Sequence, residues 1–269
     1  MLGPGSGSLI ESAVPYTYRE VRSSYGGAKA AQERHDVMFR FFARPLSFPL
    51  AWLALRFGLS PNHVTWISLA LNAAGLVMLG SGRRAYMALG VTVLLVALVL
   101  DAADGNMART ARRFSPVGEW LEGVGAYLLV AAFHVAGGIG AWLALASGAA
   151  VTSWPVSPAL GGALVAAGAI AAGTMSLTIM CAAKFSAVFP SVERDQVVAR
   201  MGRDLYGLLF TVGRNLSFAS GLVLPLTLIG ILLRRYELVL AFFAVLNSGI
   251  FAVVFLRCLT LTRQSKHAS

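Results

Sequence analysis

Hydrophobic residues along this chain gather in long blocks, and no alternating strand pattern stands out between them. Six blocks approach the roughly 20 apolar residues that a helix needs to cross a bilayer. They cover residues 63–81, 85–105, 117–146, 158–183, 205–233 and 238–257. The pattern predicts an all-α, polytopic integral membrane protein with six transmembrane helices.

The segments outside these blocks predict four regions. Residues 1–32 are rich in Gly, Ser and Tyr and form an N-terminal arm, and residues 33–57 interleave bulky apolar residues with arginines. The second pattern is typical of an amphipathic helix in the membrane interface, broken by Pro45 and Pro49. A soluble packing helix is the alternative. Residues 58–262 then form the six-helix membrane domain, and residues 263–269 a tail.

Composition and charge add a topology to this picture. The chain is 57% hydrophobic, has a mean hydropathy of +0.71 and carries a net charge of +10. Most Lys and Arg lie on the side that holds both termini, whereas the links on the other side contain Arg83, Arg84, Arg234 and Arg235. The positive-inside rule therefore predicts cytoplasmic termini in a bacterial-type inner or plasma membrane. The basicity indicates attraction to anionic lipid and no nucleic-acid partner.

Candidate chemistry lies at the inner end of the second block. Asp101 and Asp104 are one helical turn apart and so share a helix face. Carboxylates at a membrane edge suggest a cation site, and their hard oxygens suit Mg²⁺ or Mn²⁺. Gly105 and Ala108 have little bulk and would let a phosphorylated ligand approach the backbone.

Three arginines follow on the same segment and extend the site. Arg109, Arg112 and Arg113 are suited to phosphate because a guanidinium donates in a planar fork. Together with the carboxylates they describe a metal–diphosphate site at the membrane surface. The simpler alternative is that the two aspartates only pair with Arg109 and Arg112, and that Arg113 meets lipid headgroups.

The spacing of the run favours the diphosphate site. Asp-x2-Asp-Gly-x2-Ala-Arg-x8-Gly-x3 leads to Glu122 and, four residues later, to Ala126. This resembles the signature of the CDP-alcohol phosphotransferase family, D-x2-D-G-x2-A-R-x8-G-x3-D-x3-D. Six fixed positions match, the seventh stays acidic and the eighth does not match. The segment 60–65 also resembles the start of that family's first transmembrane helix, and the whole resemblance covers about residues 35–260.

The resemblance implies a reaction and a set of site residues. Members of the family transfer a phosphoalcohol from a CDP-linked donor to an alcohol and release CMP, in phospholipid or related head-group biosynthesis. They use two divalent cations and form homodimers. Carried over, the expected metal ligands are Asp101, Asp104 and Glu122. The expected cytidine-diphosphate residues are Asn62, Thr65, Asp104, Gly105, Ala108, Arg109 and Gly118.

Because Ala126 stands where the family signature has its last aspartate, the motif does not identify a general base. In the family the last aspartate is usually given this role, so Glu122 and Glu119 become the catalytic candidates. Glu119 is the best local candidate to replace the base, but the sequence favours reading it as a surface glutamate with an arginine partner. Base catalysis typically contributes about 10²–10⁴-fold, so its loss would slow the reaction without removing metal and positioning effects.

Four arginines are expected to bind the acceptor: Arg112, Arg113, Arg203 and Arg214. Arg203 resembles a position in members that make inositol-phosphate-type products. Arg214 lies within the fifth block, where an arginine either binds an acidic acceptor or reaches the headgroups. Two rival functions stay open. One is a catalytically inactive member that acts as a nucleotide- or lipid-binding or assembly subunit, and the other is a transporter.

Overall fold

The protein is helical throughout the part of the chain that its computed structural model describes. This part comprises residues 16–33, 35–148, 151–152, 157–189, 205–218 and 221–268, and it contains no strand. Four short elements come first: α1 (Tyr18–Ser23), α2 (Gly27–Gln32), the π-helical turn η1 (Phe39–Ala43) and α3 (Arg44–Arg56). Residues 39–56 of the segment predicted as a juxtamembrane helix are therefore helical, and Pro49 lies inside α3 without ending it.

Among the described residues, five long apolar helices have the length and composition to cross a membrane. These are α4 (Pro61–Leu79), α5 (Arg84–Ala111), α6 (Pro116–Ala146), α7 (Pro158–Val188) and α11 (Tyr236–Ala268). Large apolar side chains point outward from them, and Val77 and Val245 are each 75% exposed. Such a surface is costly in water and favourable in lipid, so the protein is an integral membrane protein.

The predicted fifth span needs a correction, because it is not one continuous helix. Its residues form α9 (Leu205–Ser217) and α10 (Val223–Leu232), and α10 is too short to cross a bilayer alone. Pro225 gives the physical reason. It has no N–H to donate to the carbonyl of Gly221, and its ring would clash with that carbonyl in an uninterrupted helix.

The long helices start and end at recognisable signals. Ser60, Ser115 and Ser157 are the N-caps of α4, α6 and α7, and in each case proline follows at the first helical position. The serine hydroxyl accepts from a free backbone N–H, and proline fits where no intrahelical donor is needed. The helix that carries Asp101 to Arg109, α5, ends where Arg112 adopts a left-handed conformation with φ 53°.

The helices pack in neighbouring pairs: α4 along α5, α6 along α7, and α7 along α11. Small residues permit the close contacts that lipid-embedded helices need. At the α4–α5 crossing, for example, a Cβ on Gly90 would lie 2.6 Å from the carbonyl oxygen of Gly75. α11 continues to Ala268, so residues 263–268, predicted as a tail, prolong a helix.

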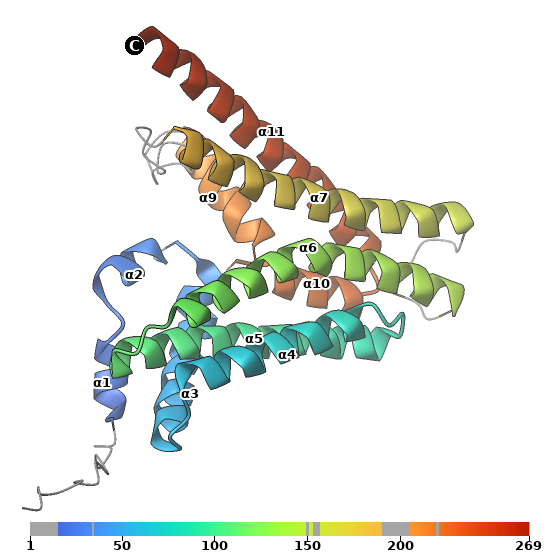
Figure 1. Cartoon of the computed structure of the whole chain (residues 1–269). Helices are drawn as coiled ribbons and strands as arrows, with labels where there is room; N and C mark the ends of the chain where they lie inside the picture. Colours follow the sequence, from blue (N-terminus) through green and yellow to red (C-terminus); the bar gives the residue numbers. More distant parts are fainter. Residues whose placement is uncertain are drawn as a thin grey trace, which may run out of the picture.

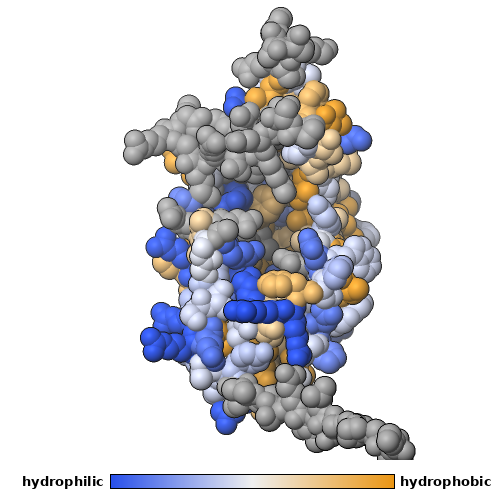
Figure 2. All heavy atoms as spheres, turned by 60° about the vertical axis from the view of Figure 1, so that its left-hand side comes forward, coloured by the Kyte–Doolittle hydropathy of each residue, from blue (hydrophilic) through white to orange (hydrophobic). Residues whose placement is uncertain are grey.

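One end of the bundle collects the polar elements. In Figure 1 the N-terminal helices, the turn between α5 and α6 and the C-terminal ends of α7 and α11 lie on the left, while the α4–α5 and α10–α11 links lie on the right. Figure 2 turns the left-hand side forward and shows hydrophilic residues gathered there. The motif residues at the end of α5 belong to this end of the molecule.

Candidate functional site

A polar cavity of about 550 Å³ opens where the start of α4, the end of α5 and the start of α6 meet. All seven residues predicted to cradle cytidine diphosphate line it, and so do the predicted Arg113 and Glu119. The lining residues are Pro61, Asn62, Thr65, Asp104, Gly105, Ala108, Arg109, Arg113, Phe114, Ser115, Pro116, Gly118 and Glu119. Residues from positions 61 to 119 are thus brought to one site.

Asp104 is held in this cavity by a neighbouring helix. Its side chain is buried, and the Thr65 hydroxyl lies 2.6 Å from Asp104 Oδ2 and 3.1 Å from the carbonyl oxygen of Pro61. The shorter contact makes the carboxylate the better acceptor of the single hydroxyl proton. A hydrogen bond from a fixed threonine orients the carboxylate.

Two glycines leave space beside the polar groups. A Cβ on Gly118 would lie 2.9 Å from Asn62 Oδ1, which is closer than real side chains approach. Asn62 reaches across to the N-cap Ser115, with Nδ2 and Oγ 3.5 Å apart. Gly105 lies beneath the guanidinium of Arg109, where a Cβ would be 3.4 Å from its terminal nitrogens. A side chain at position 118 would therefore collide with the cavity wall, whereas a methyl group at position 105 would make an ordinary contact with the Arg109 guanidinium.

Arg109 is joined to a buried polar group that the sequence did not single out. Its Nη2 donates to Asn106 Oδ1 at 2.7 Å, and the same oxygen accepts from Arg44 Nη1 at 3.0 Å. Arg44 also donates to the carbonyl of Ala102. The sequence signal that could have identified Asn106 was its spacing, because residues 102, 106 and 109 share one face of α5.

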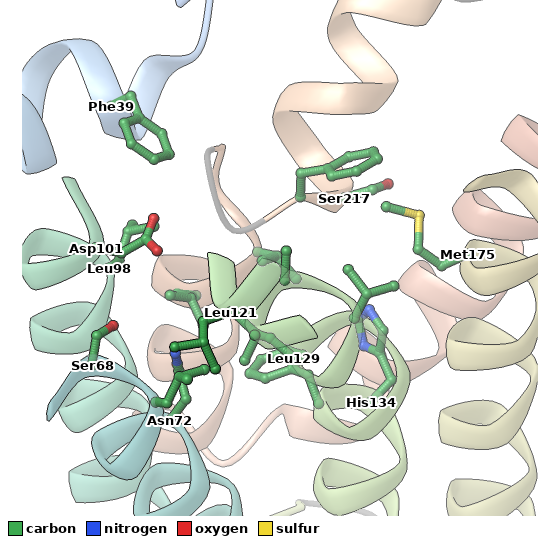
Figure 3. A pocket seen from close by; sticks show the side chains of 18 of the residues that line it. Phe39, Ser68, Asn72, Leu98, Asp101, Leu121, Leu129, His134, Met175 and Ser217 are labelled. Atoms are coloured by element: carbon green, nitrogen blue, oxygen red, sulfur yellow. The ribbon is translucent and has the colours of Figure 1, made fainter. Parts of the chain in front are cut away.

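Asp101 lines a second, mostly apolar cavity of about 230 Å³ that extends between the helices from the polar end (Figure 3). Its wall includes Leu98 of α5, Leu129 and Phe133 of α6, and Met175 of α7. Thr65 lines both cavities, so the two meet beside the carboxylate pair. Among the described atoms of this wall, the buried Asn72 Oδ1 and Ser217 Oγ have no hydrogen-bond partner.

The positions of α6 that were considered for the general base lie beside different cavities. Glu119 is exposed and lines the polar cavity, whereas Ala126 lines the apolar cavity. The backbone of Glu122 belongs to α6, but its side chain lies outside the described residues. Within the described part of the chain no three Asp, Glu, His or Cys side chains cluster closely enough to hold a metal ion. Of the three predicted metal ligands, Asp101 and Asp104 have described side chains. Their carboxylates are one turn apart on α5 and suit a hard cation.

The four predicted acceptor arginines do not share one location. Arg113 lines the polar cavity, and Arg112 is exposed at the end of α5. Arg203 lies outside the described residues. Arg214 has a protein partner, since its Nη2 is 2.7 Å from Asp36 Oδ1. Burial raises the pKa of Asp36, and the charge of Arg214 opposes this effect.

Comparison with known proteins agrees with this geometry. The model of the CDP-alcohol phosphatidyltransferase family, a family of transferases, matches residues 58–183, which contain α4, α5, α6 and most of α7. A search of the curated proteins gives no match. The matched stretch includes every residue that lines the polar cavity and all the motif positions. Over residues 58–183 the protein is therefore similar to the CDP-alcohol phosphatidyltransferase family.

Proposed function

We propose that this protein transfers a phosphoalcohol from a CDP-linked donor to an alcohol acceptor and releases CMP. The observation that carries the proposal is the polar cavity, in which all seven predicted nucleotide residues meet. The similarity to this family supports the reaction class. The acceptor oxygen forms a new bond to the donor's outer phosphorus, the bond from that phosphorus to the oxygen of CMP breaks, and the hydroxyl proton leaves to a base.

The residues of the polar cavity suggest distinct roles in binding the donor. Arg109 and Arg113 provide positive charge for the diphosphate. Gly118 and Gly105 leave room for the Asn62 amide and the Arg109 guanidinium that lie over them in the cavity wall. Asp101, Asp104 and Glu122 would hold Mg²⁺ or Mn²⁺. Bound there, a divalent cation would neutralise negative charge on the diphosphate. Thr65 fixes Asp104 for this purpose.

The apolar cavity suggests that one of the two substrates is a lipid. It starts beside Asp101 and continues along α6 from Leu121 to His134, which corresponds to about 20 Å of helix. An acyl or similar chain could lie there while the reacting group stays at the carboxylates. Asn72 Oδ1 and Ser217 Oγ would then be available to a polar group of the ligand.

Glu119 and Glu122 are the proposed candidates for general base. Glu119 lines the cavity that would hold the diphosphate, whereas position 126 offers only a methyl group. The charge distribution of the sequence favours a cytoplasmic site. Two copies of the chain are proposed to form a homodimer, by analogy with the family.

The test is to offer a panel of CDP-alcohols, each with candidate acceptors and with Mg²⁺ or Mn²⁺, to the purified protein and to measure CMP. We expect release with at least one donor, and loss of release on adding EDTA. Asp101→Asn and Asp104→Asn should abolish it while leaving the melting temperature near that of the wild type. CMP release that survives both substitutions would refute the assignment of the site.

Ala126 favours a second candidate function, a binding or assembly subunit without turnover. The variant Ala126→Asp separates the two. If the chain is an enzyme that works without this carboxylate, wild-type release is measurable, and the aspartate should raise it by about tenfold or more if the lost group acted as base. No release from the wild type, together with CDP binding, would favour the subunit.

A further inference from the structure

The buried amide of Asn106 links the polar cavity to the N-terminal segment of the chain. Asn106 is fully buried, and its Oδ1 accepts from both Arg109 Nη2, at 2.7 Å, and Arg44 Nη1, at 3.0 Å. Arg109 lines the polar cavity, whereas Arg44 does not. One neutral side chain therefore lies between a cavity arginine and an arginine of α3.

The orientation of this amide is fixed from its other side. Asn106 Nδ2 donates to Ser47 Oγ at 2.8 Å, and Ser47 Oγ donates to the carbonyl oxygen of Arg44 at 2.9 Å. Ser47 thus uses its only proton on Arg44 and can only accept from Asn106. The amide nitrogen must face Ser47, so the oxygen must face the two guanidinium groups.

Arg44 is in turn held by the segment that precedes it. Its Nε and Nη2 donate to the two carboxylate oxygens of Glu33 at 2.7 and 2.6 Å, a bidentate pair in which both side chains are buried. Lys29 and Tyr25 also contact the Glu33 carboxylate, at 3.2 and 3.0 Å. Charge at Arg44 is thereby neutralised, which lowers its repulsion of Arg109.

We propose that Asn106 is a positioning residue that holds the Arg109 guanidinium toward the diphosphate, with Arg44 and Glu33 as its support. The N-terminal segment, which precedes the residues matched to the family, would thus complete the nucleotide site. This inference rests on the proposed function, because it assumes that the polar cavity binds CDP. Without Asn106 the Arg109 side chain would keep its charge but lose the hydrogen bond that directs its Nη2.

The test is the affinity for CDP with Mg²⁺, measured by calorimetry on the full chain in detergent, in a double-mutant cycle. Asn106→Leu should weaken binding by about tenfold, the order expected for a hydrogen bond to a charged group. In an Arg109→Ala background the same change should have no further effect, because its target is gone. Asn106→Asp, which keeps an acceptor for both arginines, should retain most of the affinity.

Asn247→Leu is the matched control. Asn247 is also fully buried and donates to the carbonyl of Ala171, away from the polar cavity. This variant should lower the melting temperature without weakening CDP binding. Equal CDP affinity in Asn106→Leu and wild type, or equal losses in the presence and absence of Arg109, would overturn the positioning role alone. A wild-type chain that binds no CDP would instead overturn the proposed function as well.

Discussion

Gly118 lies against Asn62 in the wall of the polar cavity. This contact joins the first turns of α4 and α6, and the space for a side chain at position 118 is already taken by the Asn62 amide oxygen. A methyl group there must displace Asn62 or tilt α6. The requirement for glycine is therefore a matter of close approach, since Gly118 lies within regular helix.

We predict that Gly118→Ala lowers CDP affinity, whereas Gly123→Ala on the same helix does not. Gly123 has open space where its Cβ would stand. Both changes favour helix by up to about 1 kcal/mol, so the difference between them isolates the cavity contact. The measurement is CDP binding by calorimetry, with circular dichroism as a check on helix content. Similar affinities for the two variants would contradict the proposed packing.

Much of the site follows from the motif, and the exceptions have physical causes. Asp104, Gly105, Ala108 and Arg109 share a face of α5 whatever surrounds the helix, so local spacing predicted that they would line one cavity. The contact of Asn106 with Arg44 spans 62 positions, and no local rule indicates it. Arg214 was left between two readings because its partner, Asp36, lies far away in sequence.

Among the elements, the pair α4 and α5 positions the two sides of the carboxylate site. Thr65 is on one helix and Asp104 on the other, so their 2.6 Å contact depends on how closely the helices cross. Gly75 and Gly90 make that crossing possible farther along the pair. Sequence predicted these two helices well, because each is long, apolar and bounded by clear signals.

We predict that Gly90→Leu destabilises the protein and that Gly173→Leu does not to the same degree. A Cβ at position 90 would lie 2.6 Å from the Gly75 carbonyl and 2.8 Å from the Leu79 nitrogen, whereas position 173 is open. Overpacking typically costs about 1–3 kcal/mol. Thermal unfolding in detergent measures the effect, and CMP release should fall with it. Equal melting temperatures for the two variants would contradict this crossing.

The divided fifth span shows where the sequence pattern was insufficient. Residues 205–233 are apolar enough to look like one long helix, but hydropathy does not register the missing N–H of Pro225. The result matters for the site, because Ser217 at the end of α9 and Val223 at the start of α10 both line the apolar cavity. The break between α9 and α10 thus forms part of the wall of the apolar cavity proposed for a lipid chain.

At the scale of the whole molecule, the N-terminal segment is attached to the membrane domain through buried charges. Burial alone would raise the pKa of Glu33, but its hydrogen bonds and charge contacts with Arg44 and Lys29 hold that pKa below the ordinary 4.5. A depressed acid pKa gives stability that is present above the unfolded value and is lost as pH falls through the folded value.

We therefore predict a pH-dependent difference between the wild type and Glu33→Gln. The wild type should have the higher melting temperature at neutral pH, and its advantage should shrink as pH falls below about 4.5. Asp36 has a raised pKa and contributes with the opposite sign. The Glu33 charge is one cause of that rise, so Glu33→Gln also lowers the pKa of Asp36, and this effect makes the wild-type advantage at neutral pH smaller. An advantage that persists unchanged into strong acid would argue against an ion pair at Glu33.

The most direct test of the account is the binding of CDP itself, since CDP is common to every possible donor and needs no knowledge of the alcohol. CDP is titrated into the wild type and into Asp104→Asn, each with Mg²⁺ and each with EDTA. We predict saturable binding of CDP to the wild type that requires Mg²⁺ and is lost in Asp104→Asn, with both proteins folded. Absence of binding to the wild type, or equal affinity in the two proteins, would contradict it.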